Sequence, residues 1–226
     1  MFEEFSRRNR AVIAAMSLAA TRDWGEISLA DIAQEGNLSL ADLRREFVCK
    51  NDLLRAFQAE VDAQVLARVK PGGAEDTVRD QVFEAVMTRF EILAPYKEAL
   101  KRITQYLRCR PGEASMFVCS RLISQYWTLS SAGAKLEGPT GLARVAGLSA
   151  VYGKAFSVWL EDDSPSLDKT MATLDRGLKN GERALQNMEK VCGTVCGFLR
   201  EFRRSFRQKS RPDDEPSSGP APAPSV

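Results

Sequence analysis

Three cations, Arg44, Arg45 and Lys50, lie close together in the N-terminal third of the chain. Guanidinium and ammonium groups grouped in this way can neutralise phosphates, and phosphate neutralisation supplies much of a protein's affinity for nucleic acid. Two serines, Ser28 and Ser39, precede them, each followed three residues later by an aspartate. These five residues are the candidate nucleic-acid contacts.

Catalytic chemistry has few candidates in this sequence. The 226 residues include no histidine, which removes the commonest general base and metal ligand. The five cysteines contain no C-x-x-C pair, and this favours reduced, mostly buried thiols. Cys192 and Cys196 lie one helical turn apart but lack partner ligands. We therefore expect no enzyme activity, no metal site and no cofactor.

Residues 27–54 must position the candidate contacts, and their pattern predicts two short helices, a tight turn and a longer helix. The two serine–aspartate pairs are capping boxes that begin the short helices. Gly36 and Asn37 tolerate the left-handed conformation that a sharp helix exit needs. With a helix over residues 3–22, this forms a three-helix unit with a helix-turn-helix, which commonly lays its second helix in a DNA groove.

The order of four segments resembles the DNA-binding end of TetR-type transcription regulators: RRNRAVIAAMSLAATRDWG, ISLADIA, LSLADLRREF and CKNDLLRAF. The resemblance covers about residues 7–57. It departs from the family pattern at Asn37, where a turn glycine is usual, and at Arg44, where the family has a tyrosine that contacts phosphate. The resemblance implies an all-α fold with an N-terminal reading head and a ligand-binding and dimerisation domain.

The net charge of residues 1–70 allows two interpretations of this N-terminal head. Residues 1–70 hold ten Lys or Arg and eleven Asp or Glu, a net charge of 10 − 11 = −1. A DNA-binding head of this composition must concentrate its cations on one face. The alternative is a solvated helix on a fold that has lost DNA binding. The net charge of +2 for the whole chain does not decide between them.

The pattern from residue 76 to 208 is helical throughout, with prolines and glycines at the expected breaks. It predicts helices at about 50–69, 76–93, 95–108, 112–131, 141–161, 165–186 and 188–208. We expect four parts: a head over 1–70, a ligand-binding and dimerisation domain over 71–187, an amphipathic basic helix over 188–209 and a disordered, proline-rich tail over 210–226.

Apolar side chains, many of them aromatic or methionine, line one face of two expected helices, 76–93 and 112–131. On the second helix this face includes Ile123, Tyr126 and Trp127. Packed core is the simpler interpretation of such a face. The alternative is a pocket for a hydrophobic molecule or lipid, which the TetR resemblance implies. The candidate ligand contacts are Phe83, Met87, Phe90, Met116 and Trp127.

Residues 148–178 are similar to the dimer-forming region of lipid-binding accessory proteins of coenzyme Q (ubiquinone) biosynthesis, which share the TetR fold. The similarity lies in Ala150-Val151-Tyr152, Asp163-Ser164-Pro165, Thr170 and Leu174-Asp175-Arg176. It implies a symmetric four-helix interface between two subunits. The candidate dimer contacts are Val151, Tyr152, Phe156, Trp159 and Leu174.

The last expected helix, 188–208, combines an apolar stripe with a basic C-terminal half. This combination is typical of a helix that lies on an anionic membrane surface. The alternative is an amphipathic helix docked on protein. The candidate membrane contacts are Phe198, Leu199, Phe202, Phe206, Arg200 and Arg203.

The sequence thus predicts a homodimeric, TetR-like transcriptional regulator that binds DNA and responds to a hydrophobic small molecule. The alternative is a lipid-binding accessory protein of coenzyme Q biosynthesis that acts at the membrane surface without DNA. A structural interaction scaffold is a third possibility. We expect a cytoplasmic protein, with peripheral membrane contact as an option, because no apolar run is long enough to span a bilayer.

Overall fold

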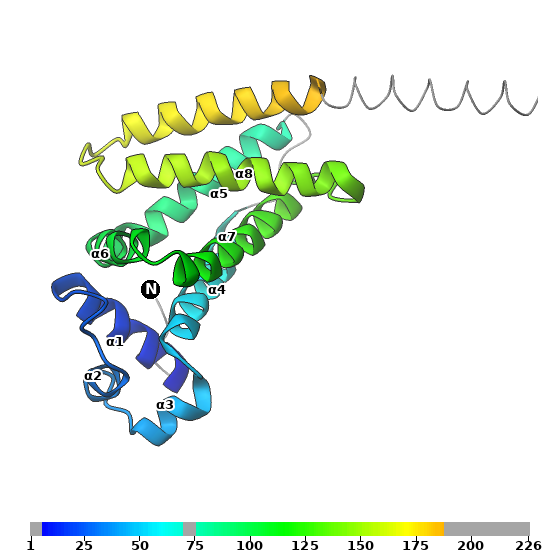
Figure 1. The fold of residues 1–226 in the computed structure, drawn as a ribbon. Helices are drawn as coiled ribbons and strands as arrows, with labels where there is room; N and C mark the ends of the chain where they lie inside the picture. The colour runs from blue at the N-terminus through cyan, green and yellow to red at the C-terminus, as the bar shows by residue number, and fades with distance from the viewer. Residues whose placement is uncertain (1–5, 70–75, 188–226) are drawn as a thin grey trace, which may run out of the picture. The chain divides into compact units, whose positions relative to one another are not determined.

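The structure is a computed structural model that describes residues 6–69 and 76–187. Every regular element in these ranges is a helix, which confirms the expected all-α fold (Figure 1). Contacts divide the chain into two units, Met1–Leu185 and Gln186–Val226. The first unit contains nearly all of the described residues.

The chain order of the helices follows the predicted breaks to within a few residues. A further helix, residues 168–187, follows α8. The labelled elements are α1 (Arg7–Thr21), α2 (Leu29–Glu35), α3 (Leu40–Glu46), α4 (Lys50–Arg68), α5 (Val78–Leu93), the 3-10 turn η1 (Ala94–Tyr96), α6 (Lys97–Arg108), α7 (Pro111–Ser131) and α8 (Gly138–Trp159).

Aspartates at the third helical position fix the starts of four successive helices, α2 to α5. Asp31, Asp42 and Asp80 accept hydrogen bonds from the N-cap hydroxyls of Ser28, Ser39 and Thr77. Asp52 accepts instead from the backbone N–H groups of residues 48 and 49. Each bond satisfies a polar group at a helix end. Three acidic side chains of the head, Asp31, Asp42 and Asp52, are therefore engaged in hydrogen bonds at helix starts.

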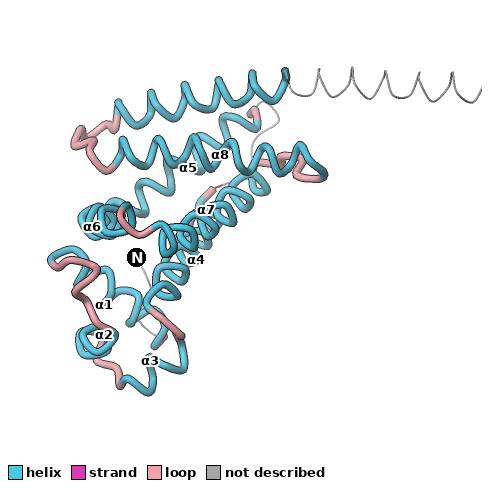
Figure 2. The backbone as a smooth tube through the Cα atoms, viewed as in Figure 1, coloured by secondary structure: helices cyan, strands magenta, loops and turns pink. Residues whose placement is uncertain are grey.

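The turn between α2 and α3 takes the predicted shape and appears as a short loop (Figure 2). Asn37 has φ +49°, the left-handed conformation that asparagine adopts at modest cost. Gly36 lies against α1, where an added Cβ would be 3.4 Å from both the Arg10 carbonyl oxygen and the Ala14 Cβ. The turn thus places α3 beside α1.

The core of the head joins the rest of the unit without a break. α1 packs against α2, α3, α4 and α6, while α4 packs against α5 and α7. Trp24 is fully buried between these elements. Figure 1 shows α8 beside the helix of residues 168–187, and a Cβ on Gly177 would lie only 2.6 Å from a Val151 methyl group.

The face that α7 buries differs from the prediction. Ile123, Tyr126 and Trp127, expected in the core, are 56%, 47% and 50% exposed. Polar Ser124 and Gln125 are buried instead, at 2% and 0% exposure. Hydrogen bonding offsets the cost for Ser124, whose hydroxyl donates to Asp62 at 2.8 Å. Apolar periodicity alone therefore assigned the wrong face.

Candidate nucleic-acid interface and interior cavity

The outer surface of α3 is where two of the predicted cations lie. Arg44 is exposed and forms no ion pair with any described residue. The Arg45 side chain is 72% exposed, and its guanidinium lies 3.2 Å from the Asp42 carboxylate. Arg7 of α1 also pairs with Asp42, at 2.9 Å. One aspartate thus gathers two guanidinium groups and anchors α3 to α1.

The hydroxyls of Ser28 and Ser39 are both engaged as helix caps. Ser28 accepts a hydrogen bond from the backbone N–H of Asp31 at 3.1 Å, and Ser39 accepts one from Asp42 at 3.0 Å. The Ser39 hydroxyl lowers the pKa of Asp42, and Arg7 and Arg45 add to this effect. These serines position α2 and α3, so their hydroxyls are already in use.

Lys50 lies inside the head rather than beside the two arginines of α3. Its ammonium donates hydrogen bonds to the carbonyl of Trp24 and, at 2.8 Å, to that of Ile27. It also lies 4.6 Å from the centre of the Trp24 ring. Burial lowers the pKa of Lys50. Lys50 thus ties the start of α4 to the loop before α2, and we exclude it from the surface that would meet DNA.

A small interior cavity of about 40 Å³ lies between α4, α5, α6, α7 and α8. Its wall is aromatic over much of its area but carries two guanidinium groups, an amide and two hydroxyls. A cavity of this size has room for about three water molecules, and pockets for drug-sized ligands are roughly tenfold larger. The lining residues are Phe57, Gln58, Val61, Arg89, Leu93, Leu100, Phe117, Arg121, Ser124, Tyr152 and Phe156.

A buried ion pair borders this cavity. The Arg89 guanidinium lies 2.5 Å from the Asp62 carboxylate, with side-chain exposures of 5% and 12%. Ser124 donates to the other carboxylate oxygen of Asp62. Arg121 donates from Nε to the Ser149 hydroxyl at 3.2 Å. Burial raises the pKa of Tyr152, so its hydroxyl stays protonated at neutral pH.

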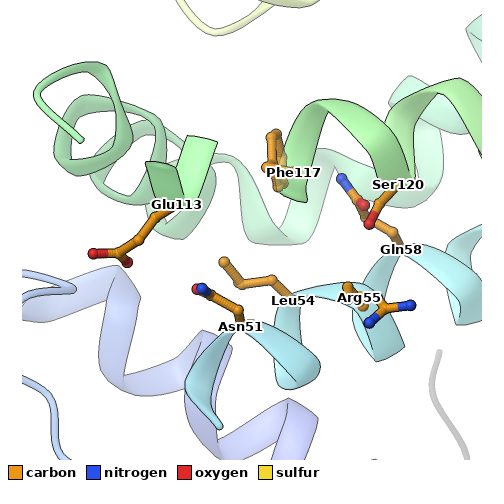
Figure 3. A pocket seen from close by; sticks show the side chains of 7 residues that line it. All are labelled: Asn51, Leu54, Arg55, Gln58, Glu113, Phe117 and Ser120. Carbon is orange, nitrogen blue, oxygen red and sulfur yellow. The ribbon is translucent and has the colours of Figure 1, made fainter. Parts of the chain in front are cut away.

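Two further hollows lie along α4. One hollow, of about 10 Å³, lies between α4 and α7. Figure 3 shows Phe117 and Ser120 of α7 facing the side chains of α4. Gln58 and Phe117 line both this hollow and the interior cavity. The other is an open groove of about 370 Å³ toward α1 and α3. Gln58 and Asp62 line this groove, so the ion pair stands between the groove and the cavity.

Four of the five predicted ligand contacts are not among the residues that line the cavity. Phe90 is fully buried and stacks on Tyr152 and Trp159, with ring centroids 5.7 and 5.4 Å apart. Phe83 and Met87 are half-buried against the core. Trp127 is 50% exposed. The side chain of Met116 lies outside the described part of the structure.

Four of the five predicted dimer contacts are buried within the chain itself. Tyr152, Phe156, Trp159 and Leu174 are 7%, 7%, 1% and 0% exposed. Val151 is half-buried and faces Gly177 of the neighbouring helix. Aromatic residues at helical spacing in a bundle fill the subunit's own core first, and this accounts for the difference. A subunit interface on α8 has to use its other face.

The amino-acid pattern contained only a weak signal for the cavity. Arg89 interrupts an apolar run in α5, and Asp62 does the same in α4, so opposite charges in two buried stretches were available to pair.

The described cysteines Cys49, Cys109 and Cys119 are exposed, contrary to the expected burial. No group of three His, Cys, Asp or Glu side chains gathers as a metal site among the residues that the structure describes.

The candidate membrane contacts, Phe198, Leu199, Phe202, Phe206, Arg200 and Arg203, lie outside the described residues, as do the expected helix 188–208 and the tail. Within the described ranges, none of the helices combines the length and the hydropathy needed to cross a bilayer. Membrane contact therefore stays a prediction from the sequence.

Comparisons with known proteins identify the architecture. The chain matches no protein-family model and no curated protein. Among solved structures, it is similar to a TetR transcriptional regulator from Nitrosomonas europaea (TM-score 0.63, 22% identity, 78% of this chain and 98% of that one). It is also similar to TetR regulators from Rhodococcus sp. (0.57, 16%, 77% and 94%) and Streptomyces coelicolor (0.54, 15%, 93% and 100%).

These likenesses bear on the two resemblances seen in the sequence. They lend no support to the similarity with coenzyme Q accessory proteins. They agree with the all-helical architecture of the described residues. The chain therefore has a TetR-like fold.

Proposed function

We propose that this protein is a DNA-binding transcriptional regulator whose helical domain binds a small organic molecule. The proposal rests on how α3 is held and on which of its side chains are exposed. This helix is held by capping and by the Arg7–Asp42 pair, and it leaves Arg44 and Arg45 exposed. A short, firmly held helix with exposed cations on its outer face is the arrangement that helix-turn-helix proteins place in the major groove.

The weak net charge of the head is compatible with this role. Asp31, Asp42 and Asp52 are engaged as caps and in ion pairs with arginines. Their charges are partly offset before DNA arrives, so the local field at α3 depends on Arg44 and Arg45 more than on the net sum. Glu46 remains exposed at the end of α3 and opposes them.

The proposed assembly is a homodimer, because two heads related by symmetry would read two half-sites about 34 Å apart. We place the contact on the outward faces of α8 and of residues 168–187. Ala146, Gly147 and Ala150 are exposed on α8, and Leu142 is 75% exposed. Space around Gly147 is open, so a second subunit could approach the backbone of α8 closely.

DNA selection tests the function directly. The purified full chain is incubated with fragmented genomic DNA, and bound fragments are sequenced and then assayed for affinity. We expect an enriched palindromic site, bound with an affinity that falls steeply with salt. Replacing both Arg44 and Arg45 by Ala should weaken binding about tenfold or more, since each lost phosphate or base contact costs about 1 kcal/mol or more.

The matched control removes two exposed arginines from another helix. Arg102→Ala with Arg108→Ala lowers the net charge equally but leaves α3 intact. This variant should bind the selected site almost as well as the unchanged protein. Recovery of no enriched sequence at low and moderate salt, or equal losses in the two double variants, would contradict the proposal.

A further inference from the structure

The interior cavity has an unbalanced positive charge. Two guanidinium groups, Arg89 and Arg121, line it, and one carboxylate, Asp62, pairs with Arg89. Arg121 has no acidic partner among the described residues and donates only to the Ser149 hydroxyl. Arg121 is only half-buried, so water screens part of its charge, but no carboxylate balances it within the cavity. The cavity therefore favours a ligand that carries one negative charge.

Unsatisfied hydrogen-bonding groups indicate where such a charge would be held. Arg89 is 4% exposed, and its Nε is the donor at the cavity that has no hydrogen-bond acceptor within the described part of the chain. Two acceptors there, Gln58 Oε1 and (apart from its ion-pair contact) Asp62 Oδ1, also lack a hydrogen-bond donor. Its Nη2 is occupied by Asp62. A guanidinium can donate along two edges at once, and carboxylates suit this planar fork. The free edge of Arg89 is thus an anchor for a second carboxylate.

Size restricts which part of a ligand the cavity can take. At about 40 Å³ it is much smaller than the roughly 150 Å³ cavity that accepts benzene. With room for about three water molecules, the cavity can take the carboxylate group itself, and an aliphatic chain would extend beyond it past Phe117. Phe57, Phe117 and Phe156 supply apolar wall for the chain, and half-buried Phe117 also lines the hollow between α4 and α7.

We propose that the cavity binds the carboxylate of a small aliphatic acid, with Arg89 as the anchor and Arg121 as the balancing charge. This inference rests on the proposed function only in that it names the class of molecule to which the regulator responds. Asp62 stays paired with Arg89, and its negative charge opposes the approach of a second carboxylate to the free edge. Replacing Asp62 by a neutral residue should therefore favour the acid.

Thermal unfolding with butyrate as the probe tests the proposal, using the full chain without DNA. Butyrate should raise the midpoint of unfolding in the unchanged protein, whereas butyramide, which matches its shape without the charge, and chloride at equal concentration should not. Asp62→Asn should unfold at a lower temperature, since Arg89 loses its partner, and butyrate should raise its midpoint more than that of the unchanged protein.

The matched control is the double variant Asp62→Asn with Arg89→Met, which removes both charges and keeps similar volumes. It should fold and should bind butyrate roughly 10- to 100-fold more weakly than the unchanged protein, as expected for a lost charge-assisted hydrogen bond. If Asp62→Asn does not fold, the unchanged protein and the double variant still decide the matter by calorimetric titration with butyrate.

Three results would overturn the inference: equal shifts with butyramide, equal shifts with chloride, or undiminished butyrate binding by the double variant. The DNA assay is separate. Sequence-specific DNA binding without a butyrate response would overturn the ligand class and leave the regulator intact. A butyrate response that depends on Arg89, in a protein that selects no DNA, would support the ligand class and contradict the regulator.

Discussion

Asp162 shows how one side chain closes a connection between two helices. Its carboxylate accepts four hydrogen bonds, from the backbone N–H and hydroxyl groups of both Ser164 and Thr170. The residue is only 2% exposed. These bonds hold the pKa of Asp162 well below its ordinary value, and the Ser164 hydroxyl contributes most. The carboxylate must be ionised to accept all four.

Asp162→Asn should therefore lower the thermal midpoint at pH 7, and the deficit should depend on pH. A carboxyl whose pKa is lowered by folding stabilises the protein fully above its unfolded pKa, about 4, and loses that contribution as the pH falls through the folded pKa. The difference between the unchanged protein and the variant should shrink below about pH 4. Circular dichroism melts from pH 7 to pH 3 measure it.

The adjacent Asp163 provides the control, because its side chain is 94% exposed and forms a surface ion pair with Lys97. Asp163→Asn should change the midpoint little at any pH, as is usual for surface ion pairs. A deficit in Asp162→Asn that stays constant down to pH 3 would show that ionisation is not what stabilises this turn.

At the scale of elements, one glycine sets how closely α8 meets the helix of residues 168–187. A Cβ at Gly177 would lie 2.6 Å from a Val151 methyl group, closer than packed side chains allow. Gly177→Ala should thus destabilise the protein by about 1–3 kcal/mol through overpacking. Adding Val151→Ala should recover part of this loss, because it removes the methyl group in the way. Urea unfolding measures both.

Gly181 in the same helix separates packing from backbone effects. An added Cβ there meets open space. Gly181→Ala should stabilise the chain by about 0.5–1 kcal/mol, the usual helix-propensity gain. If the two alanine variants behave alike, the close approach at Gly177 has no energetic consequence.

Helix positions could be predicted from the sequence because their ends are determined locally. Serine or threonine caps with an aspartate three residues later, and prolines at first turns, act over a few residues and need no knowledge of the fold. The left-handed Asn37 belongs to the same class of local signals. These features also carried the correct assignment of the TetR-like fold.

The faces of the helices could not be predicted in the same way. Ser124 is buried because Asp62, far away in sequence, is there to accept its hydrogen bond. Lys50 turns inward because two carbonyls of a preceding loop lie within its reach. Long-range partners of this kind decide whether a polar side chain is buried, and a single sequence does not reveal them. The cavity, which depends on such partners, was accordingly missed.

At the scale of the whole molecule, the proposed dimer predicts a specific sensitivity on α8. Ala146 is exposed on the face assigned to the partner. Ala146→Arg should place like charges opposite each other across the two-fold axis and dissociate the dimer. Analytical ultracentrifugation should find about 50 kDa for the unchanged protein, twice the chain mass of 25.0 kDa, and the mass of one chain for the variant.

Tyr126→Arg introduces the same charge on the exposed face of α7. It should leave the dimer intact. Dissociation by Tyr126→Arg, with a stable Ala146→Arg dimer, would move the interface to α7 and its exposed aromatic side chains. Loss of specific DNA binding should accompany dissociation in either case, because a single head retains only one half-site.

The continuity of α4 gives the molecule a mechanical property. Lys50 at its first turn is tied to the loop before α2, and Asp62, twelve residues later, is tied to Arg89 and Ser124. A rigid helix keeps these two anchorages about 18 Å apart. If the proposed ligand binds beside Arg89, the rigid α4 would couple its binding to the orientation of the N-terminal helices. In the proposed regulator, ligand binding would then change the angle at which α3 meets DNA.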